Sequence, residues 1–438
     1  MGQKAKVPDR HDRLTACVVA ALALATPFAA SAASTWTVNT CDQGYSGSGK
    51  TGTLRYAAAN AASGDTINMT ALPCSTISLT TGSINFSQPN LTINGPGKDK
   101  LTILGKFGGY IRIFAHTGSS GTLTINDLSM AYGRYSGLSA TGGCIFSSGS
   151  LSINRVSLHK CGATSGGVPT YKGGAIYAAK NLTFKYSEAA NNLAGYGGAI
   201  YTKGNLLMTG SAITANLAIT GGGLFVYGNT TVAGSVIAGN TANNGAGGIV
   251  AYNRSSSGPG NLKSSIINST ISGNAGPGLY TNSGYVYLRN ATIAFNESPG
   301  VWISDAKAPV AVTMQSSLIA NNGASSGIDL QVPDPSSLTL TFSGANNLVR
   351  KTLAAVPPDT LKNVCPLLGP LRNNGGLAQT HALLSHSPGI DQGNNNTALT
   401  WDQRGSPFAR VSGSFADIGA YEVQQNDIVF NAGFDGCP

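Results

Sequence analysis

The sequence predicts an all-β protein, a right-handed parallel β-helix with a short capping helix near its N-terminus. Glycine accounts for 58 of the 438 residues and charged residues for only 10%, which favours turns and strands over long helices. A Gly-Gly run followed by an apolar and an aromatic residue recurs every 24 residues, at 173–177, 197–201 and 221–225. Such a period is typical of repeat architectures. Each unit holds short β-rich stretches broken by Gly and Asn, which fits one coil hydrogen-bonded to the next coil about 4.8 Å away.

An asparagine at a constant offset supports the same architecture. Runs aligned with 211–216 end in asparagine in successive units, while Cys161 takes this place in an earlier coil. The asparagines at this position are Asn192, Asn216, Asn240, Asn274, Asn296 and Asn322. We expect them to stack at one turn and to share side-chain amide bonds along the stack. The alternative is that they only form turns, and the constant offset favours the ordered ladder.

The chain divides into four segments. Residues 1–32 have a basic start, an apolar core and a small-residue cleavage site, which is typical of a secretory signal peptide; a membrane anchor is the alternative. Residues 33–90 are expected to cap the exposed end of the solenoid, with the best helical stretch of the chain at 54–62. Residues 91–345 form the predicted β-helix, and residues 346–438 a C-terminal module. We expect an exported protein, extracellular or on the outer cell surface, without a transmembrane span in the mature chain.

Six cysteines remain after removal of the signal peptide. An even number in an exported protein predicts disulfides, although sequence alone leaves the pairing open. Proximity along the chain favours the pairs Cys41–Cys74, Cys144–Cys161 and Cys365–Cys437. The spacings of structural zinc sites are absent from the sequence, and we expect neither a metal nor a cofactor.

Three stretches resemble known families. The run from Thr53-Leu54-Arg55 to Gly64-Asp65-Thr66-Ile67 resembles the opening motif of secreted bacterial right-handed β-helix proteins, with Tyr56 where that motif often has Glu. The Gly-Gly-x-Ile-Tyr and Ser-x-Ile-x-Gly-Asn runs resemble polymorphic outer-membrane protein repeats. The stretch 368–422 resembles the C-terminal module of choice-of-anchor surface proteins. These resemblances imply an exported, pectate-lyase-like solenoid and leave its chemistry open.

One column of side chains is expected to carry aromatic rings on the outside of the solenoid. If Ile176 and its counterparts point inward, the next residue of each coil points outward. The rings expected in this column are Tyr177, Tyr201, Phe225, Tyr280 and Trp302, with Val250 between the third and the fourth. Sugar rings stack on exposed aromatic faces, so we interpret the column as a polysaccharide-binding platform. The alternatives are a row covered by a loop or by the C-terminal module, or strand propensity alone.

The charge of the chain predicts an acidic partner. The formal net charge is +9, and removal of residues 1–32 lowers it to +7. The segment between residues 141 and 325 contains ten Lys and Arg but only three Asp and Glu. A basic body with an aromatic row suits an acidic polysaccharide. We do not expect nucleic acid to be the partner, because no nucleic-acid-binding motif occurs. A basic surface without a ligand is the alternative.

The distribution of carboxylates limits the chemistry. Glu188 and Glu297 lie four coils apart, roughly 19 Å, which is too far for a glycosidase pair. Acids are also too few for calcium-dependent lyase chemistry, and His116 and His159 are interpreted as turn or surface residues. A metal-independent lyase needs a cation for the uronate carboxylate and groups that move protons. The candidates, which fall on three consecutive coils, are Lys203, Tyr227, Tyr252 and Arg254. Surface residues without catalytic function are the alternative.

Two functional hypotheses follow. The first is a monomeric, exported protein that engages an acidic polysaccharide. If it is an enzyme, a metal-independent polysaccharide lyase is favoured over a glycoside hydrolase. The second is a non-catalytic surface adhesin or structural protein of the polymorphic outer-membrane type.

Overall fold

The computed structural model describes residues 2, 32–164, 170–252, 261–304, 310–324, 327–332, 340–425 and 427. The chain divides into two compact units, Met1–Ala33 and Ser34–Pro438. The predicted signal peptide lies almost wholly outside the described residues. Within the described residues, no helical segment combines the length and the apolar character that a membrane span requires.

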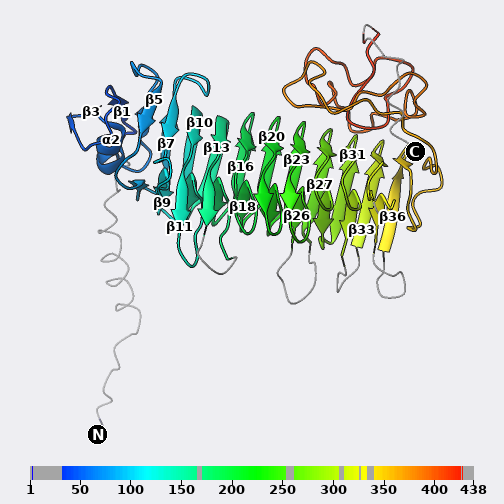
Figure 1. Cartoon of the computed structure of the whole chain (residues 1–438), viewed down its shortest axis with the longest axis horizontal. Helices are drawn as coiled ribbons and strands as arrows, with labels where there is room; N and C mark the ends of the chain where they lie inside the picture. The colour runs from blue at the N-terminus through cyan, green and yellow to red at the C-terminus, as the bar shows by residue number, and fades with distance from the viewer. Residues whose placement is uncertain are drawn as a thin grey trace. The chain divides into compact units, whose positions relative to one another are not determined.

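The second unit is a parallel β-solenoid of about ten turns, as the sequence predicts (Figure 1). One side of it is a ten-stranded parallel sheet in which each coil contributes one strand. These strands are β6 (Ile84–Phe86), β9 (Phe114–His116), β12 (Ile145–Ser147), β15 (Ile176–Ala178), β18 (Ile200–Thr202), β22 (Leu224–Val226), β26 (Ile249–Ala251), β29 (Leu279–Thr281), β32 (Val301–Ile303) and β35 (Leu330–Gln331).

A larger sheet of 23 strands takes two strands from most coils of the described chain. Its first row is β4 (Thr66–Asn68), β7 (Leu91–Asn94), β10 (Thr122–Ala131), β13 (Ser150–His159), β16 (Leu182–Lys185), β19 (Leu206–Thr209), β23 (Thr230–Ala233), β27 (Lys263–Ile267), β30 (Tyr285–Arg289), β33 (Val310–Gln315) and β36 (Leu340–Ala345). Its second row is β5 (Thr76–Ser78), β8 (Thr102–Leu104), the ends of β10 and β13, β17 (Glu188–Ala190), β20 (Ala212–Thr214), β24 (Val236–Ala238), β28 (Thr270–Ser272), β31 (Thr292–Ala294), β34 (Leu318–Ala320) and β37 (Leu348–Val349).

Short strands complete the architecture. At the N-terminal end, β1 (Thr35–Val38) pairs in parallel with β3 (Thr51–Gly52) and with β4, while β2 (Gly47–Ser48) pairs antiparallel with β3. Two small sheets form on the turns that lead from the second row to the ten-stranded sheet. They are the pairs β11 (Arg134–Ser136) with β14 (Gly162–Thr164) and β21 (Leu217–Ala218) with β25 (Thr241–Ala242).

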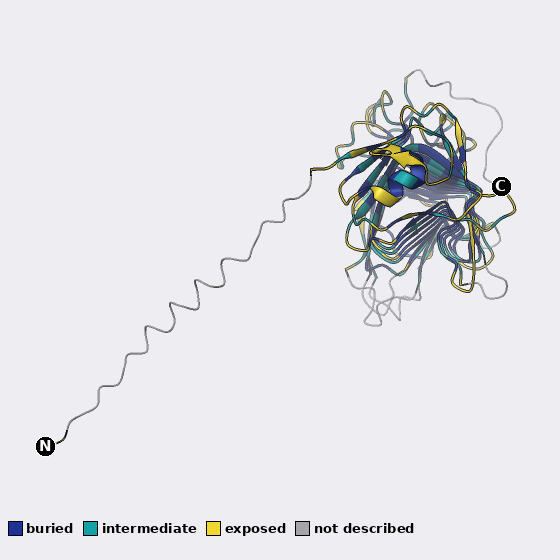
Figure 2. Cartoon of the chain, turned by 90° about the vertical axis from the view of Figure 1, so that its left-hand side faces the viewer, coloured by how far each residue is buried: buried dark blue, intermediate teal, exposed yellow. Residues whose placement is uncertain are grey.

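Successive coils superpose in register, which confirms the predicted repeat. Ile176 pairs with Ile200, which pairs with Leu224, and all three side chains are fully buried. Figure 2, which looks along the solenoid, shows the strands stacked behind one another and coloured mainly as buried. The double glycine has a steric cause. Gly197 has a left-handed φ of 64°, and a Cβ on Gly198 would lie 2.1 Å from the carbonyl oxygen of Gly222.

The asparagine ladder is confirmed. Each Asn side chain accepts from the backbone N–H and the amide Nδ2 of its counterpart in the preceding coil, at 2.8–3.1 Å. The ladder starts at Cys161, whose N–H donates to Asn192, and ends at Asp329, which accepts from Asn322. Burial raises the pKa of Asp329 to about 6. These hydrogen bonds along the ladder pair amide and backbone groups that would otherwise be unpaired in the core.

The capping helix α2 (Leu54–Asn60) starts where the sequence predicts. The Thr53 hydroxyl accepts from the N–H of Tyr56 and caps the helix. Leu54 and Ala58 are buried against the first coils. Arg55 donates to four backbone carbonyls, two of which belong to Gln43 and Ser83, so this side chain joins the helix to the following turn.

Two of the three predicted disulfides are present. Cys41 bonds to Cys74 and Cys144 to Cys161. In the third predicted pair, Cys365–Cys437, Cys437 lies outside the described residues. Disulfides are typical of oxidising compartments, which agrees with the predicted export.

The C-terminal region, residues 346–425, packs along the second row of the large sheet (Figure 1). Several polar contacts fix it there. Among them, Asn268 Nδ2 donates to Trp401 O at 3.2 Å, Ala420 N donates to Thr292 Oγ1 at 2.9 Å, and Ser272 Oγ lies 2.7 Å from His381 Nε2. The region packs against the outer side of β24, β28, β31 and β34 and reaches Ala212 of β20, while none of these contacts involves β10 or β13. The N-terminal half of this row is therefore open for a site.

Candidate functional site

The predicted aromatic column exists and its rings stack on one another. The centroids of Phe146, Tyr177, Tyr201 and Phe225 follow at 5.5, 5.5 and 5.4 Å, with interplanar angles of 6°, 7° and 21°. One ring comes from each of β12, β15, β18 and β22, whose middle residues are in register. Tyr280 and Trp302 continue the column on β29 and β32, with centroids 5.7 Å apart in an edge-on arrangement.

The prediction that the whole row is exposed was wrong for three rings. Tyr177, Tyr201 and Phe225 are only 7%, 3% and 6% exposed. Each presents its faces to the neighbouring rings, and cationic side chains cover the stack: Lys172 Nζ lies 5.5 Å from the Tyr201 centroid and Lys203 Nζ 5.9 Å from that of Tyr177. Alternation along a strand places a side chain on the outer side, but it does not say what packs there. Tyr280 and Trp302 are half-buried.

The column is interrupted where a pocket opens. Val250 on β26 is in register with Phe225 before it and Tyr280 after it, and it carries no ring. A pocket of about 720 Å³ lies at this position. Its described lining residues include Tyr196, Phe225, Val250, Tyr252, Tyr280, Glu297 and Trp302. Three of the five predicted substrate-binding rings, Phe225, Tyr280 and Trp302, therefore line this pocket. The role in substrate binding stays a prediction for all five.

Of the predicted catalytic residues, Lys203, Tyr227 and Tyr252 lie on the same side of the solenoid as the aromatic column. Tyr227 packs edge-on against Tyr201 at 5.7 Å and against Tyr252 at 6.1 Å. Tyr252 is 38% exposed, and the exposed Lys203 covers Tyr177. Arg254 lies outside the described residues. Lys203, Tyr227 and Tyr252 thus form a continuous surface with the stack, and their catalytic role stays a prediction.

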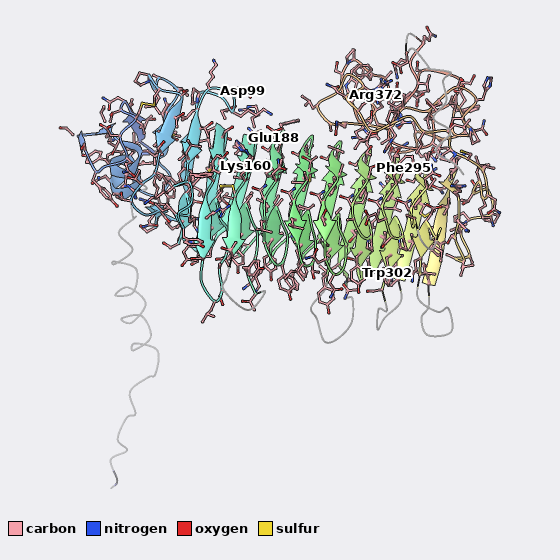
Figure 3. The ribbon with its side chains drawn as sticks, in the orientation of Figure 1. Asp99, Lys160, Glu188, Phe295, Trp302 and Arg372 are labelled. Carbon is pink, nitrogen blue, oxygen red and sulfur yellow. A yellow bond between two sulfur atoms is a disulfide. The ribbon has the colours of Figure 1, made fainter. Side chains whose placement is uncertain are left out.

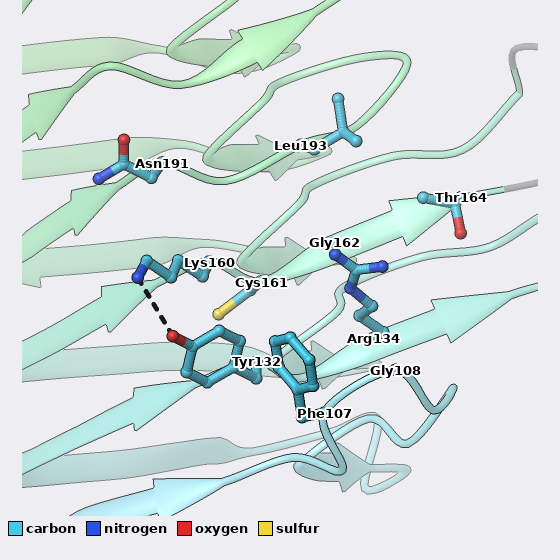
Figure 4. A pocket seen from close by; sticks show the side chains of 10 residues that line it. All are labelled: Phe107, Gly108, Tyr132, Arg134, Lys160, Cys161, Gly162, Thr164, Asn191 and Leu193. Carbon is cyan, nitrogen blue, oxygen red and sulfur yellow. Dashed lines mark hydrogen bonds between the residues drawn. The ribbon is translucent and has the colours of Figure 1, made fainter.

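A second pocket, which we call the Lys160 pocket, lies at the edge of the open half of the large sheet (Figure 4). Its volume is about 340 Å³. Tyr132 and Lys160 directly follow β10 and β13, and each has a left-handed φ, 57° and 56°, that turns the chain toward the next strand. Arg134 begins β11 shortly after Tyr132 in the same coil, and Phe107 comes from the loop after β8. In Figure 4, Lys160 and Arg134 lie on either side of Cys161–Gly162.

The Lys160 pocket combines cations with rings. Lys160 Nζ donates to the Tyr132 hydroxyl at 3.1 Å, and Phe107 packs edge-on against Tyr132 at 5.6 Å. Phe107 is 84% exposed. Among the described lining residues of this pocket, Lys160 and Arg134 are the charged ones, and none is Asp or Glu. The arrangement presents positive charge and apolar ring surface to the same small volume.

His159 lies beside this pocket, which sequence reasoning did not anticipate. It ends β13, and its ring is 6.5 Å from that of Tyr132. Burial lowers the pKa of His159, the positive charge of Lys160 lowers it further, and Glu188 acts in the opposite direction. The imidazole is therefore neutral near pH 7, since its ordinary pKa is about 6.5. The sequence offered no signal for this, because Tyr132, His159 and Glu188 belong to three different coils.

Charged residues also meet on the outer side of the second row. Lys98 Nζ lies 3.2 Å from Glu188 Oε1, although ninety residues separate them. Arg155 donates two hydrogen bonds to the Asp127 carboxylate, from Nε to Oδ1 at 2.5 Å and from Nη2 to Oδ2 at 2.6 Å. These four residues line a cavity of about 530 Å³ that Leu377 of the C-terminal region also borders. Figure 3 shows Glu188 and Lys160 near one edge of the solenoid and Trp302 at the opposite edge.

Comparison with known proteins yields a single structural similarity to report. No protein-family model and no curated protein matches the chain. The crystal structure of pectate lyase Pel9A is similar at 12% sequence identity and a TM-score of 0.40, over 89% of this chain and 97% of that chain. The resemblances to polymorphic outer-membrane repeats and to the choice-of-anchor module stay predictions.

Proposed function

We propose that the protein binds an acidic polysaccharide through the Lys160 pocket. The observation that carries this proposal is the convergence of Lys160, Arg134, Phe107 and Tyr132 on one volume without an acidic lining residue. A uronate unit has a carboxylate and flat C–H faces. The two cations suit the carboxylate, for which charge-assisted hydrogen bonds are strong, and the rings suit the faces.

The surroundings of the pocket favour an extended ligand over a single sugar. The cavity bordered by Lys98, Asp127 and Glu188 lies along the same open half of the sheet. The acids there are engaged, Glu188 with Lys98 and Asp127 with Arg155, so much of their charge is offset. The net charge of +9 favours approach of a polyanion. A chain bound in the Lys160 pocket therefore has a path along the solenoid.

The test is binding to alginate, pectate, hyaluronan and chondroitin by pull-down and calorimetry. We expect at least one polymer to bind, and Lys160→Ala and Arg134→Ala each to weaken that binding by roughly tenfold or more. Lys263→Ala removes an exposed cation of β27 outside the pocket and serves as the control, with an expected loss below about threefold. Binding that all three variants retain equally, or no binding to any acidic polymer, would contradict the proposal.

His159 favours lyase activity as a second candidate function. A neutral imidazole can take the proton on C5 of a bound uronate, while the electron pair forms the C4–C5 double bond and the C4–O bond breaks. The Tyr132 hydroxyl, held by Lys160 at 3.1 Å, can donate a proton to the leaving oxygen. Lys160 and Arg134 would offset the negative charge that develops on the carboxylate. The sequence-derived alternative places this chemistry at Lys203, Tyr227, Tyr252 and Arg254, of which Arg254 lies outside the described residues.

Ultraviolet absorbance of unsaturated uronate distinguishes these candidates. Loss of product with His159→Ala but not with Tyr252→Phe, at unchanged binding, supports the His159 site. The reverse result supports the sequence-derived set. Binding without any product in the wild-type protein would exclude the lyase and favour an adhesin.

A further inference from the structure

The aromatic stack is missing one ring at a single position. From Phe146 to Phe225 every coil supplies a ring at a step of 5.4–5.5 Å. The next coil supplies Val250, and the coil after it supplies Tyr280, both in register. Phe225 and Val250 are only 6% and 2% exposed, so they form the buried floor at this step. The missing ring coincides with the pocket of about 720 Å³.

We propose that the pocket at this position, which we call the Val250 slot, binds one uncharged sugar ring against Tyr280, Tyr252 and Trp302. The site differs from the Lys160 pocket in position and in ligand charge, so it adds a function to the one proposed above. Tyr252 is 38% exposed, and Tyr280 and Trp302 are half-buried, so these three rings offer accessible surface for stacking. Val250 forms the base of the slot, and Trp302, edge-on to Tyr280 at 5.7 Å, forms part of its wall.

The charge of the lining selects an uncharged ligand. Glu297 is exposed at the pocket, and none of the described lining residues is Lys, Arg or His. The cations that cover the stack, Lys172 and Lys203, lie over Tyr201 and Tyr177, on the earlier coils. A carboxylate on the sugar would meet the like charge of Glu297, and the described lining residues supply no compensating cation. The oxygens of Glu297 and the amides of Asn243 and Asn244 suit sugar hydroxyls.

The size of the pocket argues against a simple packing defect. Ligand pockets have volumes of about 300–1,000 Å³, and the pocket at Val250 falls within that range. The backbone of Ala242–Gly245 and of Ala275–Pro277 borders the opening without closing it. Tyr252, 38% exposed, offers a further ring surface at the rim.

The decisive variant restores the missing ring. Val250→Tyr continues the stack into the slot, so it should reduce the affinity for a neutral oligosaccharide at least tenfold while the melting temperature stays equal or rises. Leu207→Tyr adds a ring at an exposed position of β19 and is the matched control, with unchanged affinity. The probes are hexasaccharides of glucose, mannose, galactose and xylose, measured by calorimetry and by the fluorescence change of Trp302.

Two further variants protect the test against misfolding of Val250→Tyr. Trp302→Ala removes a wall and should weaken neutral-sugar binding at least tenfold. Glu297→Gln removes the repulsion and should raise the affinity for oligouronates in the slot. The proposal is overturned if no neutral hexasaccharide binds, or if the affinity survives both Val250→Tyr and Trp302→Ala. Lys160→Ala should not change neutral-sugar binding, so failure here is distinguishable from failure of the Lys160 pocket.

Discussion

Single buried side chains carry much of the order of this solenoid, and Asn240 is a clear case. Its Oδ1 accepts from the N–H and the Nδ2 of Asn216, while its own Nδ2 donates to Ile213 O and to Asn274 Oδ1. The residue is fully buried, so water cannot replace these partners. Removing one partner from a buried pair costs the desolvation of the group left behind.

Asn240→Ala should therefore lower the free energy of unfolding by on the order of 3 kcal/mol, because two donors of Asn216 lose their acceptor. Asn229→Ala is the control, because the Asn229 Oδ1 accepts a hydrogen bond only from Lys263 N, near the surface. This variant should lose less than about 1 kcal/mol of the free energy of unfolding. Urea unfolding of the two variants measures the difference. Equal destabilisation would show that the ladder contributes no more than an ordinary turn.

At the level of elements, the contact between the C-terminal region and β28 includes one neutral histidine beside the hydrogen bond from Thr270 to Gln403. His381 Nδ1 lies 2.7 Å from Gly369 O, and Nε2 lies 2.7 Å from Ser272 Oγ. The first nitrogen donates to a carbonyl, so the second accepts from the hydroxyl. Burial lowers the pKa of His381 to about 4. Protonation adds a buried charge that this contact cannot accommodate.

The sign of the pH dependence follows from this lowered pKa. An unfolded His381 titrates near 6.5, so its contribution to stability is fully present above that pH and decreases as pH falls toward 4. Glu422, whose pKa burial raises to about 7, acts oppositely: its contribution is present below about 4.5 and decreases as pH rises through 7. We expect His381→Gln to reduce the loss of melting temperature between pH 6.5 and 4.5. An unchanged pH profile would contradict the role given to His381.

The elements that repeat were predictable, and those that do not repeat were not. The Gly-Gly step and the asparagine offset set the register, because both reflect contacts between residues at the same place of successive coils. The burial of Tyr201 was not predictable, because it depends on rings and cations from neighbouring coils. Lys98 and Phe107 belong to loops outside the repeat, so no offset relates them to Glu188 or Lys160. The pairing of Lys98 with Glu188 requires the three-dimensional register of four coils.

In the whole molecule, the two proposed sites lie on different coils of the solenoid: residues that follow β10 and β13 line the Lys160 pocket, and residues of β22, β26, β29 and β32 line the Val250 slot (Figure 3 labels Lys160 and Trp302). The Lys160 pocket relies on two cations and the Val250 slot on rings and uncharged polar groups. Electrostatic binding is screened by salt, with a Debye length of about 10 Å at 0.1 M and about 3 Å at 1 M, whereas stacking on rings is not. The affinity for the acidic polymer should therefore fall by more than tenfold between these two salt concentrations, and that for the neutral hexasaccharide should change by less than about twofold.

Because the sites are separate, the two ligands should also bind together. Saturation with the neutral hexasaccharide should leave the calorimetric titration with the acidic polymer unchanged. Lys160→Ala should leave the affinity for the neutral hexasaccharide unchanged, and Val250→Tyr should leave the affinity for the acidic polymer unchanged. A rigid stack of coils offers no hinge through which one site would alter the other, so a coupling free energy near zero is expected. Displacement of one ligand by the other, or parallel salt sensitivity of both, would mean that they share a single groove and would contradict this division of the surface.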